Sequence, residues 1–141
     1  MPKEVSAGVI IFRRNREIKY LLLHREAHER YRETWDFSSG NVEAREGEER
    51  AARREAEEET GIKDLEFIPD FKEKTFWFYR REGKTIYKEV VYFLAETKTE
   101  EVKVSTEHSS YEWLTYDDAK NRLTFKNAKV ILEKAYKFLS L

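Results

Sequence analysis

Residues 40–62 encode a helix that carries three carboxylates on one face. The stretch reads Gly40, five residues, Glu46, seven residues, and then Arg54-Glu55-Ala56-Glu57-Glu58-Glu59-Thr60-Gly61-Ile62. In a helix, Glu55, Glu58 and Glu59 stand at i, i+3 and i+4, so their side chains are neighbours. Like charges at this spacing cost ~0.2–0.5 kcal/mol per pair, and a divalent cation would reverse that repulsion. Hard cations such as Mg²⁺ take oxygen ligands and are commonly shared between a few carboxylates and substrate phosphates.

A plainer interpretation of the same stretch is a solvated surface helix. Residues 48–59 are rich in Ala, Arg and Glu, and such runs usually form exposed helices with salt bridges between successive turns. Glycines bracket this helix, however, with Gly40 and Gly47 before it and Gly61 at the position that commonly ends a helix. These bracketing glycines favour a functional site on the helix over a plain surface helix.

Length and composition restrict the class of protein. A chain of 141 residues forms one domain and is long enough to bury a core. It has no cysteine, which excludes disulfides and thiolate metal sites. No apolar run approaches the ~18 residues of a membrane span and no signal-peptide pattern opens the chain, so we expect a cytoplasmic protein without a membrane partner. With a net charge of −1, nucleic acid is not an expected partner.

The remaining sequence alternates between strand and helix patterns. Strands are expected where β-branched and aromatic residues concentrate, at 5–14, 18–24, 85–98 and 111–114, and in two shorter pieces within 65–79. A loop is expected at 38–40, and a hairpin turn at 80–84. Helices are expected at 48–60, after Thr115, and at 127–139, where the apolar stripe is Val130, Ile131, Ala135 and Phe138.

The pattern of residues 40–62 is the Nudix box, and the chain resembles the Nudix hydrolase family. Every specified position of the box is filled, with Ala56 and Ile62 at its two apolar positions. The resemblance implies an α+β fold, an α/β/α sandwich with a central mixed β-sheet, in a single Nudix domain spanning residues 1–141. It also implies hydrolysis of a nucleoside diphosphate linked to another group, with Mg²⁺ or Mn²⁺ as the cofactor.

The family match also implies roles for the box residues. Glu58 and Glu59 are the main metal ligands, and Glu55 either reaches the metal or acts as the general base. Glu46 is an outer ligand or holds the loop, and the backbone carbonyls of Ser39 and Gly40 complete the metal shell. Arg54 orients the loop by pairing with a carboxylate. Clustered carboxylates raise one another's pKa while a metal lowers it, so the residue that takes the proton stays open.

Family members often add a carboxylate from outside the box, and Glu107 is the candidate here. It lies in Ser105-Thr106-Glu107-His108, shortly before the strand expected at 111–114. The alternative for Glu107 is a solvated loop residue. His108 is a candidate for contacting a phosphate, although a single loop histidine is more often inert.

Segments outside the box are similar to the asymmetric diadenosine tetraphosphate hydrolases within this family. They are residues 7–14, 20–23, 35–37, 90–95 and 107–114. Such enzymes release ATP and AMP from diadenosine tetraphosphate and hold adenine by stacking, and a base on an aromatic face is worth about 1–3 kcal/mol. The pool of aromatic residues on the strands comprises Trp77, Phe78, Tyr79, Tyr87 and Tyr92. We expect Trp77, Tyr92 and Tyr87 to bind substrate.

The sequence departs from this subgroup just before the box. The usual Pro-Lys is Ser38-Ser39, and the usual glycine before the first box glutamate is Arg45. Cations that would replace the missing lysine are Arg45, Lys72, Lys74, Arg80 and Lys88. The departure keeps other substrates open: an oxidised nucleoside triphosphate, a nucleotide sugar or a 5′-triphosphorylated RNA. A non-catalytic nucleotide-binding domain is disfavoured because the box carboxylates are all present.

Overall fold

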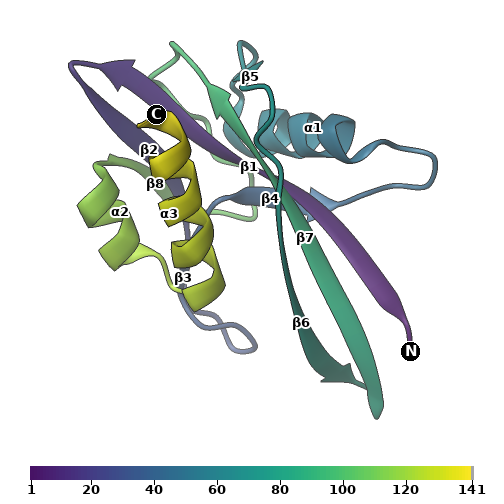
Figure 1. Ribbon diagram of the computed structural model, residues 1–141. Helices are drawn as coiled ribbons and strands as arrows, with labels where there is room; N and C mark the ends of the chain where they lie inside the picture. Colours follow the sequence, from purple (N-terminus) through teal and green to yellow (C-terminus); the bar gives the residue numbers. More distant parts are fainter. Residues whose placement is uncertain (141) are drawn as a thin grey trace.

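A mixed β-sheet lies between helices in the computed structural model, which describes residues 1–140 (Figure 1). Its strands are β1 (Lys3–Asn15), β2 (Glu17–Arg25), β3 (Thr34–Asp36), β4 (Ser38–Asn41), β5 (Glu66–Phe67), β6 (Glu73–Arg81), β7 (Lys84–Glu96) and β8 (Ser110–Leu114). The helices are α1 (Glu48–Thr60), α2 (Tyr116–Arg122) and α3 (Lys126–Leu139). This is the α+β sandwich that the resemblance predicts. In the described part of the chain, no helix is long and apolar enough to cross a membrane.

Strands β1 and β7 run in parallel through the middle of the sheet. Their pairing extends from Lys3 opposite Tyr87 to Phe12 opposite Glu96. Strand β1 also pairs antiparallel with β2 and β4, and β7 pairs antiparallel with β5 and β6. Strand β2 pairs antiparallel with β3 on one edge and with β8 on the other. The continuous apolar runs in β1 and β7 follow from burial on both faces of the sheet.

Alternation along the strands divides the core into two layers. On β1, Ile10 and Phe12 face α2 and α3, whereas Val9 and Ile11 face α1. Successive residues of a strand point to opposite faces, so each strand serves both layers. Any functional side chain on these strands therefore belongs to one face only.

Helix α1 follows the expected bounds and packs through its alanines. Ala51, Ala52 and Ala56 are fully buried, and Glu59 is the one glutamate of the helix that is buried with them. Gly61 ends the helix with a left-handed backbone (φ 73°), and its amide donates to the carbonyl of Glu57 at 2.9 Å. Glycine adopts this conformation without a steric penalty, which explains its place in the sequence.

Residues 38–41 form strand β4 and not the expected loop, so that prediction was wrong. Gly8 of β1 pairs with Ser39 of β4. A Cβ at Gly8 would lie 2.7 Å from the carbonyl oxygen of Ser38 and 2.8 Å from Tyr92 Cε1. Glycine at position 8 thus lets β4 approach β1 closely enough to continue the sheet.

Helix α3 covers the opposite face of the sheet from α1 (Figure 1). Its buried side chains are Ala128, Ile131, Leu132 and Ala135, and Phe138 packs partly against them. Val130 is 50% exposed, so its assignment to the buried stripe was wrong. The buried stripe keeps Ile131, Ala135 and Phe138, and Ala128 and Leu132 stand in place of Val130.

Candidate active site

The end of α1 lies against β4 at Gly40. A Cβ on Gly40 would overlap the carboxyl group of Glu55, so only glycine allows this carboxylate to rest on the strand. Burial raises the pKa of Glu55, and the neighbouring charges of Glu58 and Glu107 raise it further, against the effect of Arg54. Gly40, the first glycine of the box, therefore leaves the space that the Glu55 carboxyl group occupies.

Arg54 ties the loop before α1 to the helix. Its Nε and Nη2 donate to the two carboxylate oxygens of Glu46 at 2.7 and 3.0 Å. Its Nη1 donates to Glu55 at 2.9 Å and its Nη2 to the carbonyl of Asn41 at 3.0 Å. The hydrogen bonds from Arg54 hold the pKa of Glu46 at about 2, aided by the amide of Glu43. Of the two roles expected for Glu46, this geometry favours holding the loop.

Glu59 is the most buried box carboxylate, with 5% of its surface exposed. Its Oε1 accepts hydrogen bonds from Ser38 Oγ at 2.5 Å and from the Ser39 amide at 3.1 Å. Burial raises the pKa of Glu59 to about 7 despite the Ser38 hydrogen bond. Ser38 and Ser39, which depart from the family pattern, therefore position this carboxylate.

The segment 105–108 brings Glu107 and His108 to Glu59. One ligand atom from each of these three residues lies within 4.8 Å of the others. His108 Nδ1 is buried without a hydrogen-bond partner in residues 1–140, and burial lowers the pKa of His108. The Glu107 carboxylate lies 3.8 Å from Arg25 and is 63% exposed. The imidazole of His108 and the carboxylates of Glu59 and Glu107 together are a donor set for a cation.

Glu58 lies on the exposed side of this cluster. Its side chain is 59% exposed and lies 3.5 Å from Arg54. Glu55, Glu58, Glu59 and Glu107 thus form one acidic group, and Glu55 and Glu59 keep raised pKa values even with Arg54 present. This excess of negative oxygen fits a hard divalent cation.

A cavity of about 940 Å³ adjoins the acidic group across β4. Its floor is the face of β1, β6 and β7 opposite α1, and its wall is the start of α3. Ser39 and Gly40 line this cavity and also contact Glu59 and Glu55. Strand β4 therefore joins a candidate metal centre to a candidate substrate pocket.

Aromatic side chains line the cavity from more than one wall. Trp77 on β6 is 42% exposed, Tyr92 on β7 is 5% exposed, and Phe125 before α3 is 36% exposed. Trp77 and Tyr92, which were expected from the sequence to bind substrate, line the same cavity. Phe125 was not predicted from the sequence, because a single aromatic residue just before a helix does not indicate a binding site.

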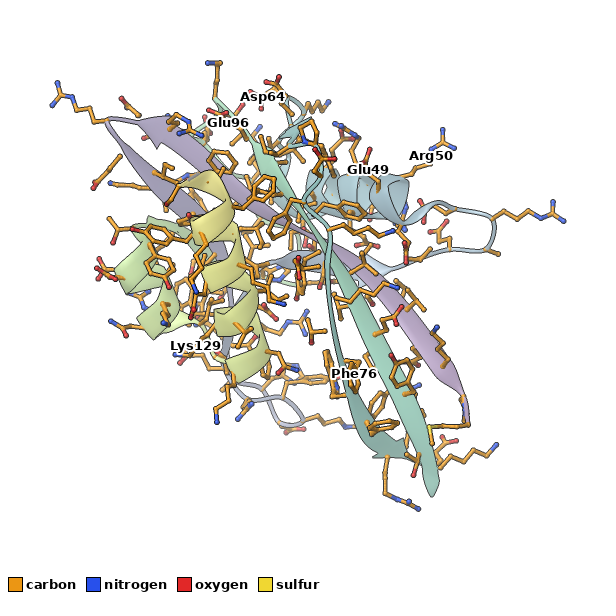
Figure 2. All side chains as sticks on the ribbon, in the orientation of Figure 1. Glu49, Arg50, Asp64, Phe76, Glu96 and Lys129 are labelled. Atoms are coloured by element: carbon orange, nitrogen blue, oxygen red, sulfur yellow. The ribbon has the colours of Figure 1, made fainter. Side chains whose placement is uncertain are left out.

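Tyr87 does not share this pocket. It lies on the other face of β7, and its ring centroid is 5.7 Å from Phe76 and 5.5 Å from Phe78. Figure 2 labels Phe76 on β6, in the β6–β7 hairpin. Tyr87 is an odd-numbered residue of a strand whose even-numbered residues Lys88 and Tyr92 face the cavity, and alternation separates them.

Lys88 alone among the five candidate replacement cations lines the cavity. Its Nζ donates to Ser6 Oγ at 2.8 Å and lies 3.5 Å from Asn41 Oδ1, beside the box glycine. Burial lowers the pKa of Lys88. Arg81, which sequence reasoning did not include, also lines the cavity and donates to Glu4 at 3.1 Å.

The other four candidate cations are engaged or placed elsewhere. Lys72 pairs with Glu48 at 3.0 Å, and Arg80 donates to the carbonyl of Gly83 at 2.7 Å. Lys74 lies 4.0 Å from Glu89, on the outer face of the hairpin. Arg45 lies in the exposed loop before α1.

Comparison with known proteins agrees with this geometry. The family model described as NUDIX domain matches residues 2–134. The asymmetrical bis(5′-nucleosyl)-tetraphosphatase of Sus scrofa is 34% identical over 145 residues, covering 95% of this chain and 94% of that protein. The Caenorhabditis elegans protein of the same name is 31% identical over 139 residues, covering 96% of each.

Solved structures show the same fold. A binary complex of C. elegans Ap4A hydrolase superposes with a TM-score of 0.82 at 30% identity, covering 97% of this chain and 98% of that one. The Escherichia coli dihydroneopterin triphosphate pyrophosphohydrolase, at 22% identity, shares the fold with a TM-score of 0.73 over 95% of this chain and 97% of that one. This chain belongs to the Nudix family.

Proposed function

We propose that this protein is a Nudix hydrolase that cleaves diadenosine tetraphosphate to ATP and AMP with Mg²⁺ or Mn²⁺. The observation that carries the proposal is the shared strand β4, which places the acidic group of α1 beside an aromatic and cationic cavity. The relatives named as asymmetrical tetraphosphatases span nearly the whole chain and support the same substrate.

The acidic group provides the ligands for the cation. Glu55, Glu58 and Glu59, with the backbone carbonyl of Gly40, would hold it, and Glu107 and His108 lie close enough to contribute. When bound, the cation neutralises charge on phosphoryl oxygens and lowers the pKa of a coordinated water. Glu46 would act at the edge of this set by holding the loop through Arg54.

The protein's own residues orient the reaction and accept a proton. Arg54 fixes Glu46 and Glu55, so the ligand face of α1 stays aligned with β4. Three carboxylates of the acidic group lie outside the Ser38 hydrogen bond: Glu55, Glu58 and Glu107. With Glu58 as a metal ligand, Glu55 or Glu107 is a suitable proton acceptor for the attacking water. Glu107 has the freer side chain of the two.

The cavity binds the nucleotide. Trp77 and Phe125 stand on different walls, and each offers a face on which adenine stacks. Lys88 and Arg81 supply cations for the polyphosphate, which compensates for the lysine absent at Ser39. Tyr92 closes the floor, and His108 lies where a phosphate oxygen would approach the acidic group. Tyr87 has no part in this arrangement because it faces the opposite side of the sheet.

The test is hydrolysis of diadenosine tetraphosphate with Mg²⁺ in isotopically labelled water. Ion-exchange chromatography should give ATP and AMP in equal amounts, and mass spectrometry should find the label in only one of them. Two molecules of ADP would contradict asymmetric cleavage. Cleavage of a nucleotide sugar, an oxidised nucleoside triphosphate or a 5′-triphosphorylated RNA, with the dinucleotide left intact, would replace the substrate and keep the site.

A further inference from the structure

Asp36, at the end of β3, lines the cavity, and its carboxyl group lies near the phenol of Tyr92. Its Oδ1 accepts the amide hydrogen of Phe37 at 2.7 Å. Within residues 1–140 it forms no salt bridge, and Arg25, whose charge also acts on Asp36, pairs with Glu107. Burial raises the pKa of Asp36 to about 6. One oxygen of a largely buried carboxyl group is thus committed, and the other is available to a ligand.

Asp36 lies toward the end of the cavity away from Lys88, whereas Lys126 lines the cavity beside Phe125. The negative charge of Asp36 raises the pKa of the Tyr92 phenol, so the two side chains lie near each other. Tyr92 is four residues along β7 from Lys88. Four residues of a strand span about 13 Å. A carboxylate only accepts hydrogen bonds and repels phosphate, so this end suits an uncharged part of the substrate that donates hydrogen bonds.

An aromatic surface stands at the same end. Thr124 and Trp35 exchange hydrogen bonds, at 2.7 Å from the Trp35 amide to Thr124 Oγ1 and at 3.1 Å from the Thr124 amide to the Trp35 carbonyl. These bonds hold Phe125, the next residue, beside the strand that carries Asp36. A base stacked on Phe125 would turn one of its edges toward the carboxyl group.

We propose that Asp36 selects the nucleobase by accepting a hydrogen bond from the exocyclic amino group of adenine, an inference that rests on the proposed function. Hypoxanthine carries a carbonyl oxygen where adenine carries this amino group. That oxygen would face the carboxylate as a second acceptor, and hypoxanthine nucleotides would therefore bind less tightly than adenine nucleotides.

The hydrogen bond from Phe37 makes this selection reversible by one substitution. In Asp36→Asn, the amide oxygen is needed to accept the Phe37 amide hydrogen, since a buried N–H requires a partner. The amide nitrogen then faces the cavity and donates. In this variant a donor would face the amino group of adenine, which is also a donor. The same donor would form a hydrogen bond to the carbonyl oxygen of hypoxanthine. Asp36→Ala offers neither group and should not distinguish the two bases.

The experiment measures the affinities of ATP and ITP by isothermal titration calorimetry with EDTA present. Their bases differ at position 6 and at N1, which carries a hydrogen only in hypoxanthine. At about pH 8, aspartates are ionised. The wild-type protein should bind ATP about tenfold more tightly than ITP, Asp36→Asn should bind ITP more tightly, and Asp36→Ala should bind both alike. Asp117→Asn, an exposed change on α2, removes the same charge outside the cavity and should keep the wild-type ratio.

Two results would overturn the inference. An unchanged ratio of ATP to ITP affinity in Asp36→Asn would show that the base edge does not meet this residue. Equal weakening of both nucleotides would assign Asp36 to the ribose or to the fold. Cleavage of diadenosine tetraphosphate by the wild-type protein, assayed in parallel, tests the proposed function separately. A reversed ratio without that cleavage would keep the base selection and discard the substrate.

Discussion

The acidic group and the nucleotide cavity adjoin each other but are built in different ways. Three carboxylates of the acidic group come from one turn of α1, and helical geometry alone brings Glu55, Glu58 and Glu59 together. The cavity draws on β1, β3, β4, β6, β7 and the start of α3. The first region is a local property of the sequence and the second is a property of the sheet. We therefore expect the catalytic group to be sensitive to single changes and the cavity to be more tolerant.

The largest effect should come from Glu58→Gln, which removes one charge from the acidic group. Its side chain is 59% exposed, so the substitution should leave the unfolding midpoint unchanged. Loss of one electrostatic partner of a developing charge costs about 100-fold in kcat, and we expect at least that here. Steady-state kinetics with Mg²⁺ provides the measurement.

Glu57→Gln is the matched control for this variant. Glu57 is the residue before Glu58 in α1 and stands outside the box pattern, on another side of the helix. It should retain wild-type kcat, although it loses the same charge from the same helix turn. Full activity in Glu58→Gln, or equal losses in both variants, would mean that the specific carboxylate face is not what the reaction requires.

The same difference decided what could be predicted from sequence. The helix 48–60 and its bracketing glycines follow from local rules, and the structure has α1 at those residues. Ser38–Asn41 became a strand because Gly8, thirty residues earlier, permits the close approach of β4. No local signal in four small polar residues reports a distant partner strand.

The cavity was only partly predictable for the same reason. Alternation correctly separates Trp77 from Phe78, but the identity of the inner face depends on how β6 pairs with β7. Phe125 and Asp36 both line the cavity, and the residues before them, Thr124 and Trp35, are joined by a hydrogen bond. A contact between residues this far apart in the chain has no periodic signature.

A smaller effect is expected for Lys88→Met, which tests the cationic end of the cavity. Lys88 is a partly buried cation, and a hydrogen bond to a charged group contributes about 1.5–3 kcal/mol. We expect KM to rise about tenfold, with weaker dependence on salt, because the polyphosphate loses one screened attraction. Lys74→Met changes a lysine on the outer face of the same hairpin and should leave KM within about twofold of wild type. A similar rise in both variants would indicate a general field and not a local contact.

The smallest effect should separate the two faces of one strand, with Trp77→Ala compared against Phe78→Ala. Both residues are exposed aromatics of β6, at 42% and 55%, and only Trp77 faces the cavity. Stacking of a base is worth about 1–3 kcal/mol, and the exposure of Trp77 places it at the low end, so KM should rise about fivefold. Phe78 contacts Phe76 and Tyr87 instead, and its removal should leave KM unchanged. Should Phe78→Ala raise KM as much as Trp77→Ala, the substrate would have to reach both faces of the hairpin, and the division of the sheet into a binding face and an outer face would fail.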